Sequence, residues 1–228
     1  MTKKELVVFT GAGISAESGI KTFRDSGGLW EEFDIYEVAT PEAWNKNQKL
    51  VLEFYNARRK QVLSAIPNAA HLALVQLEQK FNVNIITQNI DDLHERAGSK
   101  NVLHLHGEIN KARSTIDPLL IYPIIGHEIK SGEICEKGSQ LRPHIVWFGE
   151  EVPEMEQALK FVKKADIFIV IGTSLNVFPA ASLIYNTRSS AQTYLIDPNA
   201  GNFDKLPKLK VIRENACKGV CILADLLM

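Results

Sequence analysis

The segment Ile167–Ile171 reads Ile-Phe-Ile-Val-Ile and constrains the fold of this chain more than any other feature. Five consecutive apolar residues, most of them β-branched, predict a strand that is buried on both faces, as in a parallel sheet. Similar short runs recur along the chain, and amphipathic stretches separate them. This alternation predicts an α/β fold, namely a Rossmann-like, doubly wound parallel sheet with helices on both faces.

Two segments interrupt the alternation. Residues 29–67 have a mostly helical pattern, and residues 108–141 are irregular, as a functional insertion would be. We therefore expect one catalytic domain over residues 1–228, with a large lobe of about 1–30, 68–108 and 142–228 and a small lobe of about 31–67 and 109–141. The expected strands are residues 6–10, 84–87, 102–105, 145–147, 167–171, 193–196 and 210–212. The expected helices are residues 41–65, 68–80, 91–97, 154–164, 179–186 and 217–227.

Composition excludes several classes of partner. The 228 residues carry 26 Lys and Arg against 27 Asp and Glu, and this balance gives no general electrostatic attraction to nucleic acid or to a membrane surface. Three scattered cysteines do not make a disulfide framework, which indicates a reducing cytoplasm. No apolar run is long enough for a signal peptide or a membrane span. We expect a soluble cytoplasmic protein, with a monomer as the default.

A glycine-bearing loop follows the first expected strand. Gly11, Ala12 and Gly13 lie where glycines let the backbone approach a pyrophosphate at a helix N-terminus. The third glycine is Gly19, however, so the usual dinucleotide-binding spacing is broken. From this loop alone, a structural turn and a nucleotide site are about equally favoured.

Polar residues also follow three other strands. Gln88, Asn89 and Asp91 come after the second expected strand, His106 ends the third, and Thr173 lies after the run at 167–171. Carboxyl ends of parallel strands share one edge of the sheet, where such folds bind ligands. Asn89 and Asp91 would also suit helix capping. A histidine titrates near neutral pH, so His106 is a candidate general base, and strand alternation predicts that His104 lies on the same face.

Together these motifs resemble the sirtuins, the NAD-dependent protein-lysine deacylases. The matching segments are G-A-G-I-S-A-E-S-G-I with F-R-D, T-Q-N-I-D-D-L-H, L-H-G, L-R-P-H-I-V-W-F-G-E and G-T-S-L-N-V-F-P-A, in the family's order. The resemblance implies NAD as co-substrate and acylated lysines of proteins as partners. It implies that the acyl oxygen attacks the ribose carbon that loses nicotinamide, and that His106 takes a proton from a ribose hydroxyl. The products would be free lysine, nicotinamide and O-acyl-ADP-ribose.

The resemblance also assigns the site residues. The catalytic residues would be His106, Asn89 and Asp91. The cofactor-binding residues would be Gly11, Ala12, Gly13, Glu17, Phe23, Arg24, Gln88, Asn89, Ile90, Asp91, Gly172, Thr173, Ser174, Asp197 and Ala216. The substrate-binding residues would be Ala39, Tyr55, Arg58, Val146, Phe148, Gly149, Glu150 and Val177, with residues 146–150 capturing the substrate backbone as an added strand.

One helix carries a hint about the acyl group. Tyr55 and Arg58 are three residues apart and hence on one helical face, where a hydroxyl and a guanidinium would form a carboxylate receptor. The pair resembles the signature of class III sirtuins, and Ala39 matches the small residue that widens their acyl pocket. This predicts removal of succinyl or malonyl groups, with deacetylation as well. The alternative is a solvated helix face, since Arg59 and Lys60 follow.

The chain departs from many sirtuins where these carry a structural zinc. Residues 113–117 read Arg-Ser-Thr-Ile-Asp in place of a C-x-x-C pair, and beyond them Cys135 remains alone. Structural zinc needs four thiolate or imidazole ligands, so we predict a zinc-free protein whose apolar residues 119–125 pack the small lobe.

The competing functions are a mono-ADP-ribosyltransferase, an NAD hydrolase and an inactive NAD-sensing module.

Overall fold

The computed structural model describes residues 2–21, 33–173, 175, 178–201, 206 and 208–228. Within them, six strands form a parallel sheet in the order β3-β2-β1-β7-β8-β9. This arrangement confirms the predicted α/β fold. In that order, the strands are Val102–His104, Asn82–Thr87, Glu5–Thr10, Ile167–Ile171, Gln192–Ile196 and Leu209–Ile212.

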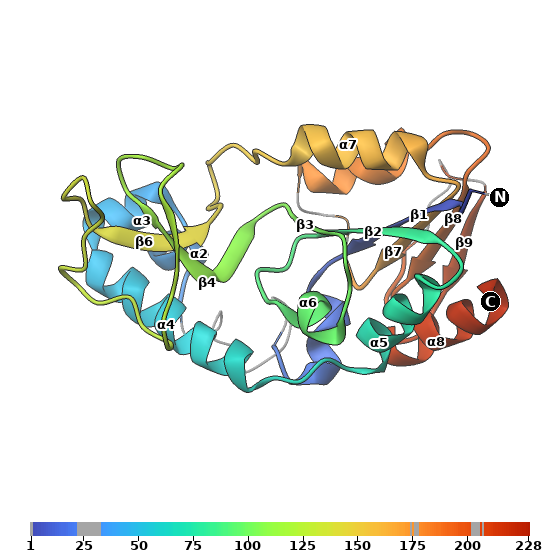
Figure 1. Cartoon of the computed structure of the whole chain (residues 1–228), viewed down its shortest axis with the longest axis horizontal. Helices are drawn as coiled ribbons and strands as arrows, with labels where there is room; N and C mark the ends of the chain where they lie inside the picture. The colour runs from blue at the N-terminus through green and yellow to red at the C-terminus, as the bar shows by residue number, and fades with distance from the viewer. Residues whose placement is uncertain (1, 22–32, 174, 176–177, 202–205, 207) are drawn as a thin grey trace.

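Both faces of this sheet are covered, which explains why its strands are continuous apolar runs. Ile167, Ile169 and Ile171 of β7 pack in one buried cluster, and Phe168 and Val170 pack in another on the opposite face. Helices α5 (Ala69–Leu77) and α8 (Ala216–Leu227) cover the first face, while α7 (Met155–Lys164) and the 3₁₀ segment η3 (Ala180–Asn186) cover the second (Figure 1). None of the described helices is long and apolar enough to span a bilayer.

A smaller lobe extends from one end of the large sheet (Figure 1). Its antiparallel sheet has the order β5-β4-β6, and helices α2, α3 and α4 pack against it around a separate apolar cluster. Helix α6 (Leu93–Ala97) belongs to the large lobe and follows β2. The elements of the small lobe are α2 (Ile35–Val38), α3 (Pro41–Lys46), α4 (Gln48–Ser64), β4 (Gly107–Ser114), β5 (Ile121–Pro123) and β6 (Leu141–Ile145).

The structure corrects several expected elements. The single helix expected at 41–65 is two helices, because the Asn47 side chain accepts a hydrogen bond from the Leu50 amide and starts α4 anew. The segment expected as a helix at 179–186 forms η3. The strand expected at 145–147 is β6, which ends at Ile145 and pairs with β4, so the lobe boundary expected between residues 141 and 142 falls inside a strand of the small sheet.

Residues 119–125 pack the small lobe in part. Leu120, Tyr122 and Ile124 contact its apolar cluster. Leu119 and Ile125 are 87% and 97% exposed and point away from that cluster. Alternation along β5 and its flanks explains the difference, because successive side chains of an extended segment face opposite sides. The expectation that these residues supply the core therefore holds for every second one.

The buried side chain of Arg59 on α4 connects this helix to strand β4 of the small lobe. Its side chain is fully buried, and its Nε donates to the Ile109 carbonyl of β4 over 2.6 Å. Its Nη1 donates to the Asn56 amide oxygen and to the His127 carbonyl. Burial lowers the pKa of this guanidinium to about 10, so it stays charged at neutral pH. This charge is a structural tie between α4 and β4 and not part of a solvated face.

We expect Arg59→Met to lower the free energy of unfolding by about 3 kcal/mol, because it leaves the buried Ile109 carbonyl without its donor and removes the bond to the His127 carbonyl. The measurement is urea unfolding followed by circular dichroism. Lys60→Met changes the exposed neighbour on the same helix and should shift stability by less than about 0.5 kcal/mol. Equal losses in both variants would contradict the structural role of Arg59.

Candidate active site

A cavity of about 430 Å³ lies along the carboxyl ends of β1, β2, β7 and β8 and reaches α4 of the small lobe. Every predicted site residue that the structure describes lines this cavity. Phe23, Arg24, Ser174 and Val177 lie outside the described residues. The remaining residues are Gly11, Ala12, Gly13, Glu17, Ala39, Tyr55, Arg58, Gln88, Asn89, Ile90, Asp91, His106, Val146, Phe148, Gly149, Glu150, Gly172, Thr173, Asp197 and Ala216. Their chemical roles stay predictions.

The loops after β1 and β7 approach each other closely beside this cavity. The Gly13 amide donates to the Gly172 carbonyl over 2.9 Å, and a Cβ on Gly13 would lie 2.6 Å from the Gly172 Cα. Gly172 itself has a φ of +59°, which side chains rarely tolerate. These glycines therefore let two backbone segments cross. The broken dinucleotide spacing fits this geometry, because Gly13 contacts another loop rather than a helix.

The loop after β2 is held in place from several sides. The Asn89 side-chain amide donates to the Gly11 carbonyl and to the Ser15 hydroxyl, each over 3.2 Å. The Ser15 hydroxyl in turn donates to Asp91, whose other oxygen accepts from the Leu93 amide. Burial raises the pKa of Asp91, and these two donors partly offset the rise. The loop thus presents a fixed amide and a fixed carboxyl group to the cavity, and its Asp91 also caps the turn into α6.

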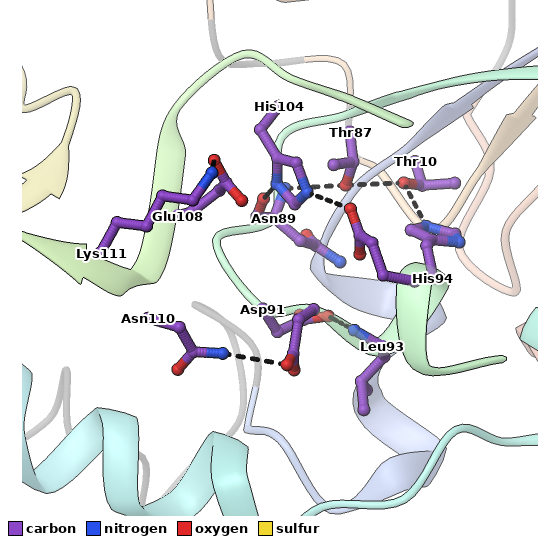
Figure 2. A network of polar contacts seen from close by, with 12 residues as sticks. Thr10, Thr87, Asn89, Asp91, Leu93, His94, His104, Glu108, Asn110 and Lys111 are labelled. Carbon is purple, nitrogen blue, oxygen red and sulfur yellow. Dashed lines mark hydrogen bonds and ion pairs between the residues drawn. The ribbon is translucent and has the colours of Figure 1, made fainter. Parts of the chain in front are cut away.

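A second layer of polar groups lies behind this loop (Figure 2). The Thr10 hydroxyl donates to Thr87 over 2.8 Å and contacts the His94 ring at 3.1 Å. The Thr87 hydroxyl also accepts from the backbone amide of Asn89. Burial lowers the pKa of His94 well below its ordinary value, so the ring is neutral. This layer connects β1, β2 and α6 under the site, although His94 Nδ1 has no hydrogen-bond partner among the described residues.

The two histidines of L-H-L-H-G hold successive carbonyl groups of the same loop. His104 Nδ1 lies 3.1 Å from the Asn89 carbonyl oxygen, and His106 Nδ1 lies 3.0 Å from that of Gln88. Strand β3 ends at His104, so the expected alternation does not continue to His106. The cavity is lined by His106 and not by His104, whose Nε2 contacts Glu95 at 2.8 Å. Both rings therefore contact the loop after β2, but only His106 also lines the cavity.

The surroundings of the two rings shift their pKa values in opposite directions. Burial lowers the pKa of His106, and the contact with the Gln88 carbonyl offsets this in part. For His104, burial also lowers the pKa, but the hydrogen bond and charge of Glu95 outweigh it and raise the value overall. A carbonyl oxygen accepts hydrogen bonds and cannot donate, so Nδ1 of neutral His106 carries the hydrogen. Its Nε2 lone pair is then left to act as a base.

Tyr55 and Arg58 form the small-lobe end of the cavity. They are 3% and 6% exposed, which rules out the alternative of a solvated helix face. The Tyr55 hydroxyl accepts from the Trp147 indole Nε1 over 3.1 Å. Burial raises the pKa of Tyr55 and lowers that of Arg58. The phenol stays protonated at neutral pH, and the guanidinium stays charged because its ordinary pKa lies far above 7.

The segment at 146–150 is a turn in this structure. The amides of Val146 and Phe148 donate to the carbonyls of His106 and Ala39. The amides of Trp147 and Glu150 are also bonded, to the Glu150 side chain and the Trp147 carbonyl. An added substrate strand would therefore have to pair mainly with carbonyl groups here, and the added strand stays a prediction.

Sequence reasoning missed several residues of the site. Ser15 lines the cavity and bonds both Asn89 and Asp91, and Trp147 lines it beside Tyr55. The signal for Trp147 was its place in W-F-G-E, but contact with a helix 92 residues away cannot be read from local pattern. Glu17, by contrast, was among the predicted residues, and at the cavity wall its carboxylate accepts from the Cys217 amide at the start of α8.

Hydrogen bonds connect the side chains of Ser114, Cys135 and Ser139 in the insertion that was predicted to lack zinc. The Ser114 and Ser139 hydroxyl oxygens lie 2.9 Å apart, and the Cys135 sulfur lies 3.4 Å and 3.3 Å from them. Lys137 forms an ion pair with Asp117 next to this cluster. One thiol and two hydroxyls do not fit a zinc ion, and the described residues contain no group of three or more potential metal ligands.

Comparison with known proteins identifies a family. The Sir2 family profile matches residues 11–179. A Bacteroides thetaiotaomicron protein named NAD-dependent protein deacylase is 52% identical over 230 residues, covering 99% of this chain and 98% of its own length. A protein of that name from Helicobacter pylori strain J99 is 54% identical over 213 residues, covering 93% of this chain and 91% of its own.

Solved structures agree with these sequence matches. A Sir2 homologue in complex with NAD has a TM-score of 0.88 at 39% identity, with 99% of this chain and 90% of that chain covered. A Sir2 complex with a deacetylated p53 peptide and 3′-O-acetyl ADP ribose has a TM-score of 0.84 at 29% identity, with 98% and 93% covered.

We expect His106 to titrate below the ordinary histidine pKa of about 6.5, because its buried ring disfavours the charged form. Long-range ¹H–¹⁵N NMR correlation spectra of the labelled protein between pH 5 and 8 give both the pKa and the tautomer. The neutral form should carry its hydrogen on Nδ1. A pKa above 6.5, or a hydrogen on Nε2, would contradict the assigned lone pair.

We predict that the purified protein holds less than about 0.1 zinc per chain, because the Ser114, Cys135 and Ser139 side chains bond one another. Metal analysis after expression in zinc-supplemented medium measures this directly. A chelator should also leave the melting temperature unchanged. Stoichiometric zinc, or a chelator-dependent fall in melting temperature, would overturn the prediction.

Proposed function

The chain belongs to the Sir2 family, and from this premise we propose that it is an NAD-dependent protein-lysine deacylase that removes succinyl and malonyl groups, and acetyl groups as well. The relatives named NAD-dependent protein deacylase support the general activity, and the matching NAD complex supports NAD as co-substrate. The acyl preference rests on one observation, which is that Tyr55 and Arg58 line the same cavity as His106.

The cavity fits a dinucleotide co-substrate. Its walls come from the carboxyl ends of four parallel strands, which is where α/β sheets bind nucleotides. The crossing of Gly13 and Gly172 brings the loops after β1 and β7 together without side chains between them. Asp197 and Ala216 line the cavity after β8 and at the start of α8, where the adenosine part would lie.

The chemistry divides between the co-substrate and the chain. NAD, when bound, would supply the ribose carbon that the acyl-lysine oxygen attacks with loss of nicotinamide. His106 acts through Nε2, which accepts a proton from a ribose hydroxyl while Nδ1–H stays bonded to the Gln88 carbonyl. Asn89 and Asp91, held by Ser15, orient the nicotinamide end. Neutral His106 is the form that this step requires, and its lowered pKa keeps it neutral at pH 7.

The far end of the cavity recognises the acyl group. An acyl chain that ends in a carboxylate presents two acceptor oxygens to the Tyr55 hydroxyl and the Arg58 guanidinium. Ala39 also lines the cavity, where its carbonyl accepts from the Phe148 amide, and its methyl side chain leaves room for a longer acyl chain. An acetyl group has no terminal carboxylate to pair with these two residues, so we expect its binding not to depend on them.

A panel of acetyl-, malonyl- and succinyl-lysine peptides assayed with NAD tests the proposal. Mass spectrometry should detect nicotinamide, free lysine and O-acyl-ADP-ribose from each substrate, and His106→Ala should abolish turnover. ADP-ribosylated protein would indicate the transferase alternative, and free ADP-ribose without deacylation would indicate an NAD hydrolase. A wild-type protein inert on all peptides would indicate an NAD-sensing module.

We expect Arg58→Met to reduce kcat/KM for succinyl-lysine by about 10- to 100-fold, because a charged hydrogen bond to a carboxylate contributes roughly 1.5–3 kcal/mol. Turnover of acetyl-lysine should change far less. Lys60→Met, on the exposed side of the same helix, is the matched control and should leave both substrates unaffected. Equal losses on both substrates in Arg58→Met would rule out a carboxylate receptor.

A further inference from the structure

Trp147 lies beside the proposed carboxylate receptor in the cavity wall. The indole is 2% exposed, and its Nε1–H donates to the Tyr55 hydroxyl oxygen over 3.1 Å. The centroids of the Tyr55 and Trp147 rings lie 6.4 Å apart, with 33° between the ring planes. Trp147 therefore shapes how Tyr55 meets the cavity, although its own nitrogen is already engaged.

This hydrogen bond fixes the polarity of the Tyr55 hydroxyl. An indole N–H can donate but has no lone pair to accept, so the Tyr55 oxygen must be the acceptor in this contact. The hydroxyl hydrogen then points elsewhere, and among the described residues Tyr55 makes no hydrogen bond as a donor. A hydroxyl held in this way offers a donor to a bound group. A carboxylate, which accepts and cannot donate at neutral pH, is the matching partner.

Trp147 is itself held rigidly. The Arg142 guanidinium carbon lies 3.3 Å from the centre of the indole ring, and the Trp44 ring packs beside it at 5.7 Å. The backbone amide of Trp147 donates to Glu150 over 2.8 Å. Glu150 also binds Arg142 twice and Arg113 on the neighbouring strand. The indole N–H is therefore fixed from the small sheet and cannot readily turn away from Tyr55.

We propose that Trp147 is a specificity-determining positioning residue, which orients the Tyr55 hydroxyl as a donor toward the terminal carboxylate of an acidic acyl group. The inference deepens the proposed function and rests on it. Trp147 acts through Tyr55 and has no proposed contact with the reacting atoms. Its effect is therefore confined to acyl groups that reach Tyr55 and present an acceptor there.

Trp147→Phe tests the proposal, since it keeps an aromatic ring and removes the N–H. We expect kcat/KM for succinyl-lysine to fall about 5- to 10-fold, mainly through KM, with acetyl-lysine within twofold of wild type. Tyr55→Phe should lose at least as much on succinyl-lysine. The double variant should match Tyr55→Phe alone, because the indole then has no hydroxyl to orient. Tyr194→Phe removes a hydrogen-bond donor from an aromatic ring on β8 that does not line the cavity, and it should leave the succinyl-to-acetyl ratio unchanged.

A second measurement uses wild-type protein, in case Trp147→Phe folds poorly. A lysine acylated with 4-oxopentanoyl carries an uncharged ketone that can accept and cannot donate, and pentanoyl is its apolar match. Wild type should favour the ketone several-fold, and Tyr55→Phe should reduce that preference toward unity. Equal turnover of the two by wild type would overturn the proposal.

The outcomes separate this inference from the proposed function. If wild type shows no turnover of acidic acyl groups, both fail. If wild type removes succinyl groups but Trp147→Phe keeps the wild-type ratio, or loses both substrates equally while remaining folded, the role of Trp147 alone is overturned. Additive losses in the double variant would likewise exclude action through Tyr55.

Discussion

The site depends on how closely two backbone segments cross at the edge of the large sheet. The Gly13 amide bonds the Gly172 carbonyl, and a side chain on either residue would overlap the other loop. This crossing aligns the ends of β1 and β7. Asn89 then reaches the Gly11 carbonyl and Ser15, which fixes the loop after β2. A wider crossing would separate groups that come from three different strands.

The sequence predicts the large lobe well because its signals are local. A fully apolar run such as Ile167–Ile171 shows burial on both faces, and parallel strands place their following residues at one edge. This reasoning located His106, Asn89 and Asp91 beside one cavity. The resemblance to a known family then supplied roles that no pattern of polarity could give.

The small lobe was harder to predict, since its contacts join distant segments. The Asn47 cap divides one apparent helix, and the burial of Arg59 follows from its contact with β4 and not from helical period. The two histidines show the same limit. Their spacing suggested equal positions, but the end of β3 and the charge of Glu95 give His104 and His106 opposite pKa shifts.

The chain of contacts from Glu150 through Trp147 to Tyr55 has an entropic consequence. These aromatic side chains have few rotatable bonds and are already ordered by Arg142, Trp44 and the turn that carries them. A ligand that binds there does not have to immobilise a flexible side chain, which costs about 0.5–1.5 kcal/mol for each rotamer-rich group. Selection by such a preorganised surface therefore keeps most of the enthalpy of each new hydrogen bond as affinity.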